Sequence, residues 1–148
     1  MKNDRLLGWR EWVYLPDLRL PLIKAKVDTG ARTSCLHAFE LDNFSKDGKP
    51  WVRFLVHPHQ HSTEVVACEA PLLENRVVTD SGGHSEERPV ICTRLALGNW
   101  EEQVEITLTS RDNMLFRMLL GRTAIKKGGF SVDPAHSYLQ NTRDPNQD

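Results

Sequence analysis

A short acidic turn, Asp28-Thr29-Gly30-Ala31, is the part of the sequence best suited to chemistry. It follows directly on an alternating, strand-like pattern at residues 23–27. A carboxylate at the end of a strand can be held in position by hydrogen bonds from the amides of its own loop, and Gly30 allows a sharp bend and the close approach of another group. An aspartate after a strand can also serve only to form an Asx turn. The residue types therefore leave both a functional and a structural role open for Asp28.

A second segment with unusual residue types, Met118-Leu119-Leu120-Gly121-Arg122, lies about ninety residues later. Residues 121–127 have the composition of a short helix, with Thr123 near its start and basic residues in its last turn. Gly128-Gly129 would end that helix, because glycine readily takes the left-handed conformation found after helix ends.

Strands must position both segments, because the dominant hydrophobic period is two. Apolar residues alternate with polar ones at residues 23–27, 52–56 and 104–109. In the last of these, Val104, Ile106 and Leu108 should form one buried face and the intervening residues a solvated one. These patterns predict an all-β chain with one short C-terminal helix.

Two hairpins are predicted from turn chemistry. Gly98-Asn99 separates the apolar run at 90–97 from the strand that follows, which is a favourable hairpin turn. Residues 76–79 lead through the turn at 80–84 back toward residue 90. The second turn contains Gly82 and Gly83 and would form the tip of a long hairpin.

Length and charge place limits on the class of protein. The chain has 148 residues and a net charge of −1, so its overall field attracts neither nucleic acid nor anionic lipid. No apolar stretch approaches the ~20 residues of a membrane span. We expect one folded domain over residues 1–140 and a polar tail over 141–148, with no membrane or nucleic-acid partner.

The cysteines and the start of the chain predict a cytoplasmic location. Cys35, Cys68 and Cys92 are odd in number and widely spaced, which is neither a disulfide framework nor a zinc knuckle. The first residues carry charges where a signal peptide would be apolar. A buried, structural thiol is the expected role for Cys35.

The ordered motifs resemble a known group of enzymes. A strand that ends in Asp-Thr-Gly-Ala, with a later apolar-apolar-Gly-Arg segment opening a short helix, resembles retropepsin-type aspartic peptidases. More closely, the sequence is similar to a bacterial family labelled ATP-dependent zinc proteases, or RimK-associated retropepsin-like proteins. That similarity rests on the segments at residues 8–13, 24–38, 87–90 and 119–122 and covers residues 8 to about 135.

The resemblance implies a closed, retropepsin-like β-barrel with Asp28 at the tip of a catalytic loop. Retropepsin chemistry needs two facing carboxylates, and this chain has one Asp-Thr-Gly, so a homodimer is implied. Two carboxylates a few Å apart share one proton; one acts as base on water while the other donates to the peptide carbonyl. Thr29 would join the two loops across the dimer axis, and Gly30 would leave room for substrate.

Two departures from the retroviral pattern concern substrate binding. The hairpin tip at Gly82 and Gly83 is the candidate flap, but His84, Glu86 and Glu87 make it polar, which is also typical of an ordinary surface turn. The residue after Asp-Thr-Gly-Ala, acidic in the viral enzymes, is Arg32, so it cannot form the viral ion pair with Arg122.

Arg32 also suggests what the substrate is. With Ala31 beside it, Arg32 is a candidate substrate-binding residue that could attract a carboxylate-bearing peptide or lower the pKa of the catalytic aspartate. A glutamate-rich substrate would suit the family's association with RimK-like ATP-grasp ligases, which add glutamates to proteins. Such a ligase is therefore an expected partner.

We expect no cofactor and no metal ion in the catalytic site. The sequence has neither a His-Glu-x-x-His motif nor a phosphate-binding Gly-x-x-x-x-Gly-Lys loop. His57, His59 and His61 are spaced by two and could hold zinc with one open position, although Pro58 and the polar neighbours are typical of a solvated loop.

Three functions therefore stay open. The first is an aspartic-type peptidase that acts on peptide or glutamate-rich, isopeptide-like bonds through a dimeric aspartate pair. The second is a non-catalytic peptide-binding module of the same fold that serves a ligase. The third is a zinc-dependent hydrolase that uses the cluster of His57, His59 and His61.

Overall fold

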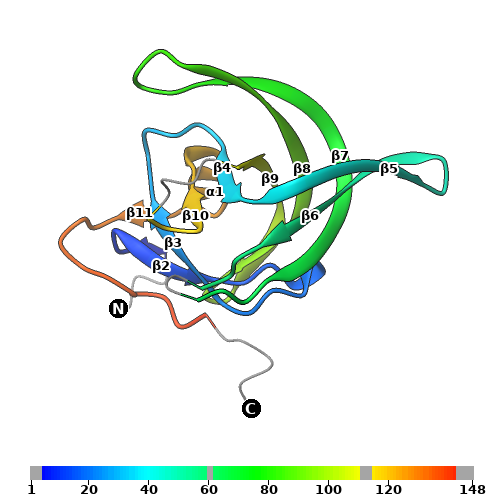
Figure 1. Ribbon diagram of the computed structural model, residues 1–148. Helices are drawn as coiled ribbons and strands as arrows, with labels where there is room; N and C mark the ends of the chain where they lie inside the picture. The colour runs from blue at the N-terminus through cyan, green and yellow to red at the C-terminus, as the bar shows by residue number, and fades with distance from the viewer. Residues whose placement is uncertain (1–4, 60–61, 111–114, 143–148) are drawn as a thin grey trace.

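The computed structural model describes residues 5–59, 62–110 and 115–142 (Figure 1). Nearly all its regular structure is β, as the sequence predicts. The elements in chain order are β1 (Leu6–Leu7), β2 (Arg10–Val13), the 3-10 turn η1 (Pro16–Leu18), β3 (Ile23–Val27), β4 (Ser34–His37), β5 (Phe39–Lys46), β6 (Lys49–Val56), β7 (Val66–Thr79), β8 (Ser85–Leu97), β9 (Trp100–Thr109), β10 (Met118–Leu120), α1 (Arg122–Lys127) and β11 (Ser131–Val132).

Nine of the strands form one strongly curved sheet in the order β2-β3-β10-β4-β9-β8-β7-β6-β5. Both predicted hairpins are present. Leu97 pairs with Trp100 across the Gly98-Asn99 turn, where Gly98 takes a φ of +62°. β7 and β8 pair from Leu72 to the tip at Thr79 and Ser85, so this hairpin is long and projects from the body (Figure 1).

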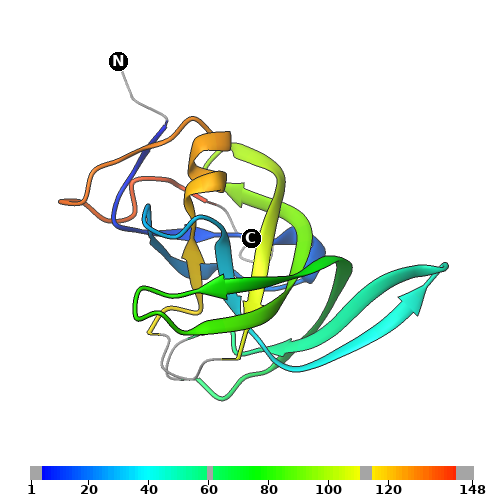
Figure 2. The same ribbon diagram turned by 90° about the horizontal axis from the view of Figure 1, so that it is seen from above.

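The expectation of a closed barrel is wrong, because the sheet is open. Its two end strands, β2 and β5, do not pair with one another in the described part of the chain. The reason is the direction of the β5–β6 hairpin, which points away from the body in both views (Figures 1 and 2), so that most of β5 is exposed. β2 instead reaches β8 through a single bridge between Tyr14 and Ala96.

The core lies in the concavity of the sheet. Alternation predicts its residues well in β9, where Val104, Ile106 and Leu108 are buried. The other face of β9 is not uniformly solvated, however, because Thr107 and Thr109 are also buried. The Thr107 hydroxyl donates a hydrogen bond to the carbonyl of Ser34 in the neighbouring β4, 3.3 Å away. Covering of this face by other strands is a tertiary effect that alternation cannot predict.

The short helix forms where the sequence predicts it. Gly121 is its N-cap residue and Arg122 begins it. Its C-terminal end follows the predicted glycine chemistry: the amide of Gly128 donates to the Ala124 carbonyl at 3.1 Å, and Gly129 takes a φ of +67°. The helix packs against β4 and β9, and this contact places the β10–α1 junction beside β4.

The core prediction is tested by replacing Leu36 with alanine. Leu36 is fully buried in β4, between β10 and β9, so the cavity left by Leu36→Ala should lower the free energy of unfolding by about 2–5 kcal/mol. Urea unfolding followed by circular dichroism measures the loss. Val77→Ala, at a side chain that is 65% exposed, is the control and should change stability by less than about 0.5 kcal/mol.

Candidate active site

Asp28 stands at the end of β3, in the loop that leads to β4. Its amide donates to the carbonyl of Leu120 at 2.9 Å, which continues the parallel pairing of β3 with β10 by one residue. On the other side, the amide of Val27 donates to the carbonyl of Trp9 at 2.9 Å. The backbone is therefore fixed on both sides at the point where the acidic side chain leaves it.

The Asp28 carboxylate is held by its own loop. Its Oδ1 accepts hydrogen bonds from the amides of Gly30 at 2.9 Å and Ala31 at 3.2 Å. Among the described residues no group donates to Oδ2, and the flanking Thr29 and Gly30 are exposed. The Asx-type turn that the sequence allowed is thus present, and it orients one carboxylate oxygen while leaving the other available to a ligand.

The β10–α1 junction fixes the rest of this loop. The amide of Arg122 donates to the carbonyl of Ala31 at 2.7 Å, and the amide of Thr123 donates to the carbonyl of Arg32 at 3.0 Å. The Arg122 guanidinium donates to the carbonyl of Thr29 at 3.0 Å. As expected, Arg122 does not pair with Arg32; the ion pair of the viral pattern is replaced by an arginine–carbonyl hydrogen bond that holds the loop tip.

Ser34 is a positioning residue that the sequence analysis missed. Its buried hydroxyl accepts a hydrogen bond from the amide of Gly121 at 2.9 Å. A side chain on Gly121 would collide with the backbone of Thr33, so only glycine permits this approach. The apolar-apolar-Gly-Arg motif marked Gly121, but a lone serine at the start of a strand carries no comparable signal.

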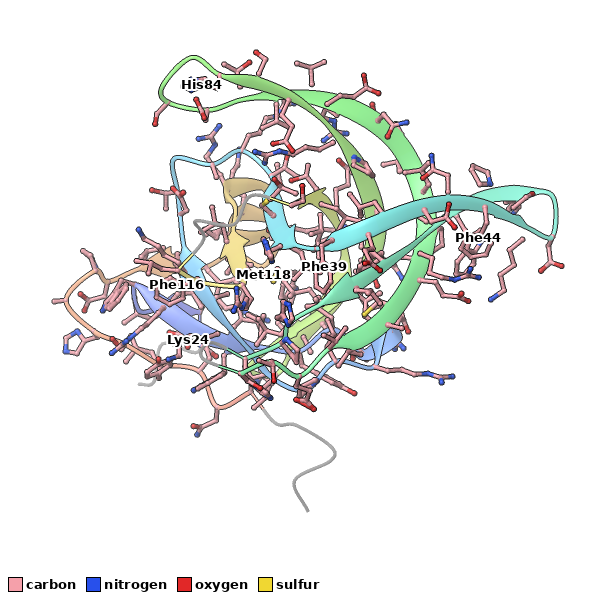
Figure 3. All side chains as sticks on the ribbon, in the orientation of Figure 1. Lys24, Phe39, Phe44, His84, Phe116 and Met118 are labelled. Carbon is pink, nitrogen blue, oxygen red and sulfur yellow. The ribbon has the colours of Figure 1, made fainter. Side chains whose placement is uncertain are left out.

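The candidate flap is the tip of the β7–β8 hairpin. The side chain of Asp80 accepts hydrogen bonds from the amides of Gly82 and His84, both at 2.9 Å, and Gly83 takes a φ of +84°. His84 lies at the tip (Figure 3). In both ribbon views the tip projects on the same side of the molecule as the loop between β3 and β4 (Figures 1 and 2).

A polar cluster close to the tip of this hairpin joins it to β4. The buried Arg88 donates through Nε to Glu86 at 3.1 Å and through Nη1 to the Cys35 sulfur at 3.6 Å. Thr109 donates to both Glu86 oxygens at 3.3 Å. Cys35 is buried, as expected, and the cluster links the candidate flap to the strand that follows the Asp28 loop.

A groove of about 660 Å³ lies beside Arg32 and Thr33, and residues of β7, β8, β9 and helix α1 line it. Its charged lining consists of Arg32, Arg76, Lys127, Glu74 and Glu105. Arg76 pairs with both carboxylates, at 2.7 and 3.0 Å, and the hydrogen bond that it donates to Glu74 is the main cause that raises its pKa. Lys127 donates to a backbone carbonyl at 2.7 Å, and Arg32 has no ion-pair partner within the described ranges. The groove therefore has an excess of positive charge next to the Asp28 loop.

The histidine cluster is only partly described. His61 lies outside the described residues. His57 Nδ1 lies 3.0 Å from the carbonyl of Glu64, and the His57 ring stacks on Phe39. His59 Nε2 lies 3.8 Å from the Glu64 carboxylate. No group of three or more potential ligands able to hold a metal ion is found within the described part of the chain.

The Cys68 thiol is not suited to act as a nucleophile. All three cysteines are free, and burial raises the pKa of the Cys68 thiol to about 12, so this thiol is neutral at physiological pH.

A bilayer-crossing helix would have to be long and apolar, and none of the described segments forms one.

Gly121→Ala tests the close approach of the two segments. The added methyl group meets the Thr33 backbone, which cannot move aside as a flexible side chain could, so the variant should lose at least about 1–3 kcal/mol of unfolding free energy. Urea unfolding measures the change. Gly82→Ala is the matched control, because its nearest neighbour is the exposed His84 side chain, and its stability should stay close to that of the parent. Equal effects of the two substitutions would contradict a tight junction.

Comparison with known proteins agrees with this geometry. The family model described as the retropepsin-like aspartic endopeptidase RimB matches residues 6–143. A Shewanella pealeana protein named "Probable alpha-L-glutamate ligase" is 44% identical over 137 residues, which are 92% of this chain and 30% of that protein. A protein of the same name from Parasynechococcus marenigrum is 48% identical over 139 residues, 93% of this chain and again 30% of the relative.

The chain thus spans about 30% of the length of the curated relatives that it matches. A crystal structure of a Legionella pneumophila protein of unknown function superimposes with a TM-score of 0.80 at 30% identity, covering 94% of this chain and all of that one. The matched family model extends over the Asp28 loop, the β7–β8 hairpin and the β10–α1 junction, so the chain belongs to the RimB-like family of retropepsin-like aspartic endopeptidases.

Proposed function

We propose that the chain is an aspartic-type peptidase whose active site forms when the Asp28 loops of two copies face one another. The observation that carries the proposal is the state of the Asp28 carboxylate: Oδ1 is fixed by two backbone amides, and Oδ2 accepts no hydrogen bond from any described residue. A carboxylate presented in this way at an exposed loop can hold a water molecule and meet a second carboxylate.

Hydrolysis by such a pair follows from its shared proton. The ionised carboxylate takes a proton from water as the water attacks the carbonyl carbon of the scissile bond. The protonated carboxylate donates to the carbonyl oxygen, which gives a tetrahedral gem-diol. The carboxyl that took the proton from water then gives it to the leaving nitrogen, and the other carboxylate takes a proton from a gem-diol hydroxyl. The C–N bond breaks, the carbonyl re-forms, and the pair again holds one proton. Aspartic proteases are the standard example of this sharing.

Asp28→Asn is the direct test of the peptidase. The amide cannot act as a base, so cleavage should fall by at least about a thousandfold, while the amide oxygen still accepts the Gly30 and Ala31 hydrogen bonds and preserves the fold. Peptide cleavage followed by mass spectrometry, with circular dichroism on the same samples, measures both. The parent should be more active at acidic pH, where the pair holds its shared proton. Undiminished cleavage by a folded variant would contradict the role of Asp28.

The same experiment separates the peptidase from a binding module of the same fold. A module that only holds peptide for a ligase would bind substrate without cleaving it, and Asp28→Asn would then change neither property. The carboxylate oxygen Oδ2, which accepts no hydrogen bond from any described residue, favours the peptidase, because a purely structural Asx turn does not require an oxygen that is available to a ligand.

We further propose that the substrate is rich in glutamate and that an ATP-grasp ligase is the functional partner. Two observations support this. The groove beside the Asp28 loop carries excess positive charge from Arg32 and Lys127. Relatives named as alpha-L-glutamate ligases contain a segment that is 44% identical to this chain. The three free cysteines suit a reducing compartment, so we also propose a cytoplasmic location.

Arg32→Gln tests the acidic substrate. Removal of the exposed guanidinium should lower kcat/KM for a glutamate-rich peptide by about five- to tenfold, mainly through KM, and leave a glutamine-matched peptide unaffected. Added salt should reduce the preference of the parent in the same direction. Lys26→Gln, at an exposed side chain on β3, is the charge-matched control and should retain the parent's preference. An equal loss for both peptides would assign Arg32 to loop structure instead.

A further inference from the structure

The first and last described segments of the chain are bound to the body of their own molecule. β1 pairs in parallel with β11, where Leu6 faces Ser131 and Leu7 faces Val132. The amide of Asp133 donates to the carbonyl of Leu7 at 2.7 Å. Segments 5–8 and 131–142, which we call the belt, therefore satisfy their strand-forming groups within one chain.

A buried carboxylate ties the belt to β2. Glu11 is fully buried and accepts hydrogen bonds from the amides of Gly8 at 2.7 Å, Leu139 at 2.9 Å and Gln140 at 3.0 Å. A buried carboxylate requires such donors, because burying an unpaired charge is very costly. Glu11 thus links the two segments of the belt, because it binds Gly8 in one and Leu139 and Gln140 in the other.

Aromatic and cationic side chains cover the same edge of the sheet. Arg10 lies between the rings of Trp9 and Tyr138, 4.6 and 4.9 Å from their centroids. Tyr138 stacks on Trp12 at 5.7 Å, and it does so at a φ of +55°, a conformation that costs a non-glycine residue free energy. Phe116 and Lys24 extend the stack at its two ends (Figure 3).

Backbone groups at the outer edge of β2 also form hydrogen bonds within the same chain. On the side away from β3, the carbonyl of Arg10 accepts the amide of Tyr138 at 3.0 Å, and the amide and carbonyl of Tyr14 pair with Ala96. The edge of a sheet recruits another chain through unpaired N–H and C=O groups. At the β2 edge the Arg10 carbonyl and the amide and carbonyl of Tyr14 already have such partners, so a strand from a second copy could not pair along the whole of this edge.

From these contacts we infer that the protein folds fully as a monomer and that a second copy docks through the Asp28 loop face, without exchange of strands between the belts. The inference rests on the proposed function, since that function requires the second copy to supply its Asp28. The exposed Thr29 and Gly30 lie at the tip of this face. Figures 1 and 2 show the belt, the flap tip and the loop between β3 and β4 on one side of the molecule.

The consequence is that self-association switches activity without controlling folding. In a dimer whose subunits share strands, dissociation and unfolding are coupled, and the midpoint of thermal unfolding rises with protein concentration. A hundredfold increase in concentration would raise that midpoint by about 3–5 °C for a dimer of chains of this length. In this protein the midpoint should not change over that range, whereas cleavage per chain should rise steeply as dimers form.

Sedimentation, thermal unfolding and peptide cleavage over a hundredfold range of concentration test the inference on the full chain. Support is a constant midpoint, a monomer–dimer equilibrium and specific activity that follows the dimer fraction. A midpoint that rises with concentration overturns it, as does full specific activity from a monomer. Absence of cleavage from the dimer at every concentration would instead refute the proposed peptidase, while the concentration-independent folding would still be measured.

Two variants separate the docking face from the belt. Thr29→Arg, at the loop tip, should abolish the dimer and cleavage with no change in the unfolding midpoint; Thr63→Arg, at an exposed loop residue before β7, is its control and should retain both. Tyr138→Ala should lower the midpoint equally at every concentration and leave the dissociation constant of the dimer within about twofold. Weaker dimerisation by Tyr138→Ala at an unchanged midpoint would place the belt in the interface and overturn the inference.

Discussion

The set of hydrogen bonds between the Asp28 loop and the β10–α1 junction is the constraint on which the site depends. The amides of Asp28, Arg122 and Thr123 each reach a carbonyl of the opposite segment within 2.7 to 3.0 Å. Gly121 makes this approach sterically allowed, and the Ser34 hydroxyl satisfies the buried amide that the approach creates. The carboxylate is therefore presented by two segments that are far apart in sequence, and neither could hold it alone.

The distribution of charge around this junction follows from the same geometry. Arg122 donates to a backbone carbonyl of the loop, so it needs no acidic partner there. Arg32 faces a groove in which Arg76 already pairs with both glutamates, and the charged lining of that groove has a net charge of +1. Arg122 supports the loop and Arg32 is available to a ligand. These roles differ because the Thr29 carbonyl lies within hydrogen-bond distance of the Arg122 guanidinium.

The edge of the sheet next to β3 is stabilised by a different kind of contact. Glu11 and the stack around Arg10 close the edge at β2, whereas the β5 edge, in the projecting β5–β6 hairpin, is largely exposed. Because β2 is covered by other segments and β5 projects away from the body, the two end strands do not meet in the described part of the chain, and the sheet does not close into a barrel. It remains an open, curved surface that carries the Asp28 loop and the candidate flap on the same side of the molecule (Figures 1 and 2).

The sequence by itself determined the strand-rich fold class, the two hairpins, the helix with its glycine ending and the position of Asp28, because alternation, turn chemistry and a local motif are properties of neighbouring residues. It could not reveal the partners of Ser34, the burial of Glu11 and Thr107, or the open sheet. Each of these depends on contacts between segments about seventy to one hundred and thirty residues apart. Only the packing of the whole chain decides which backbone amides lie near a given side chain and whether the ends of a sheet meet.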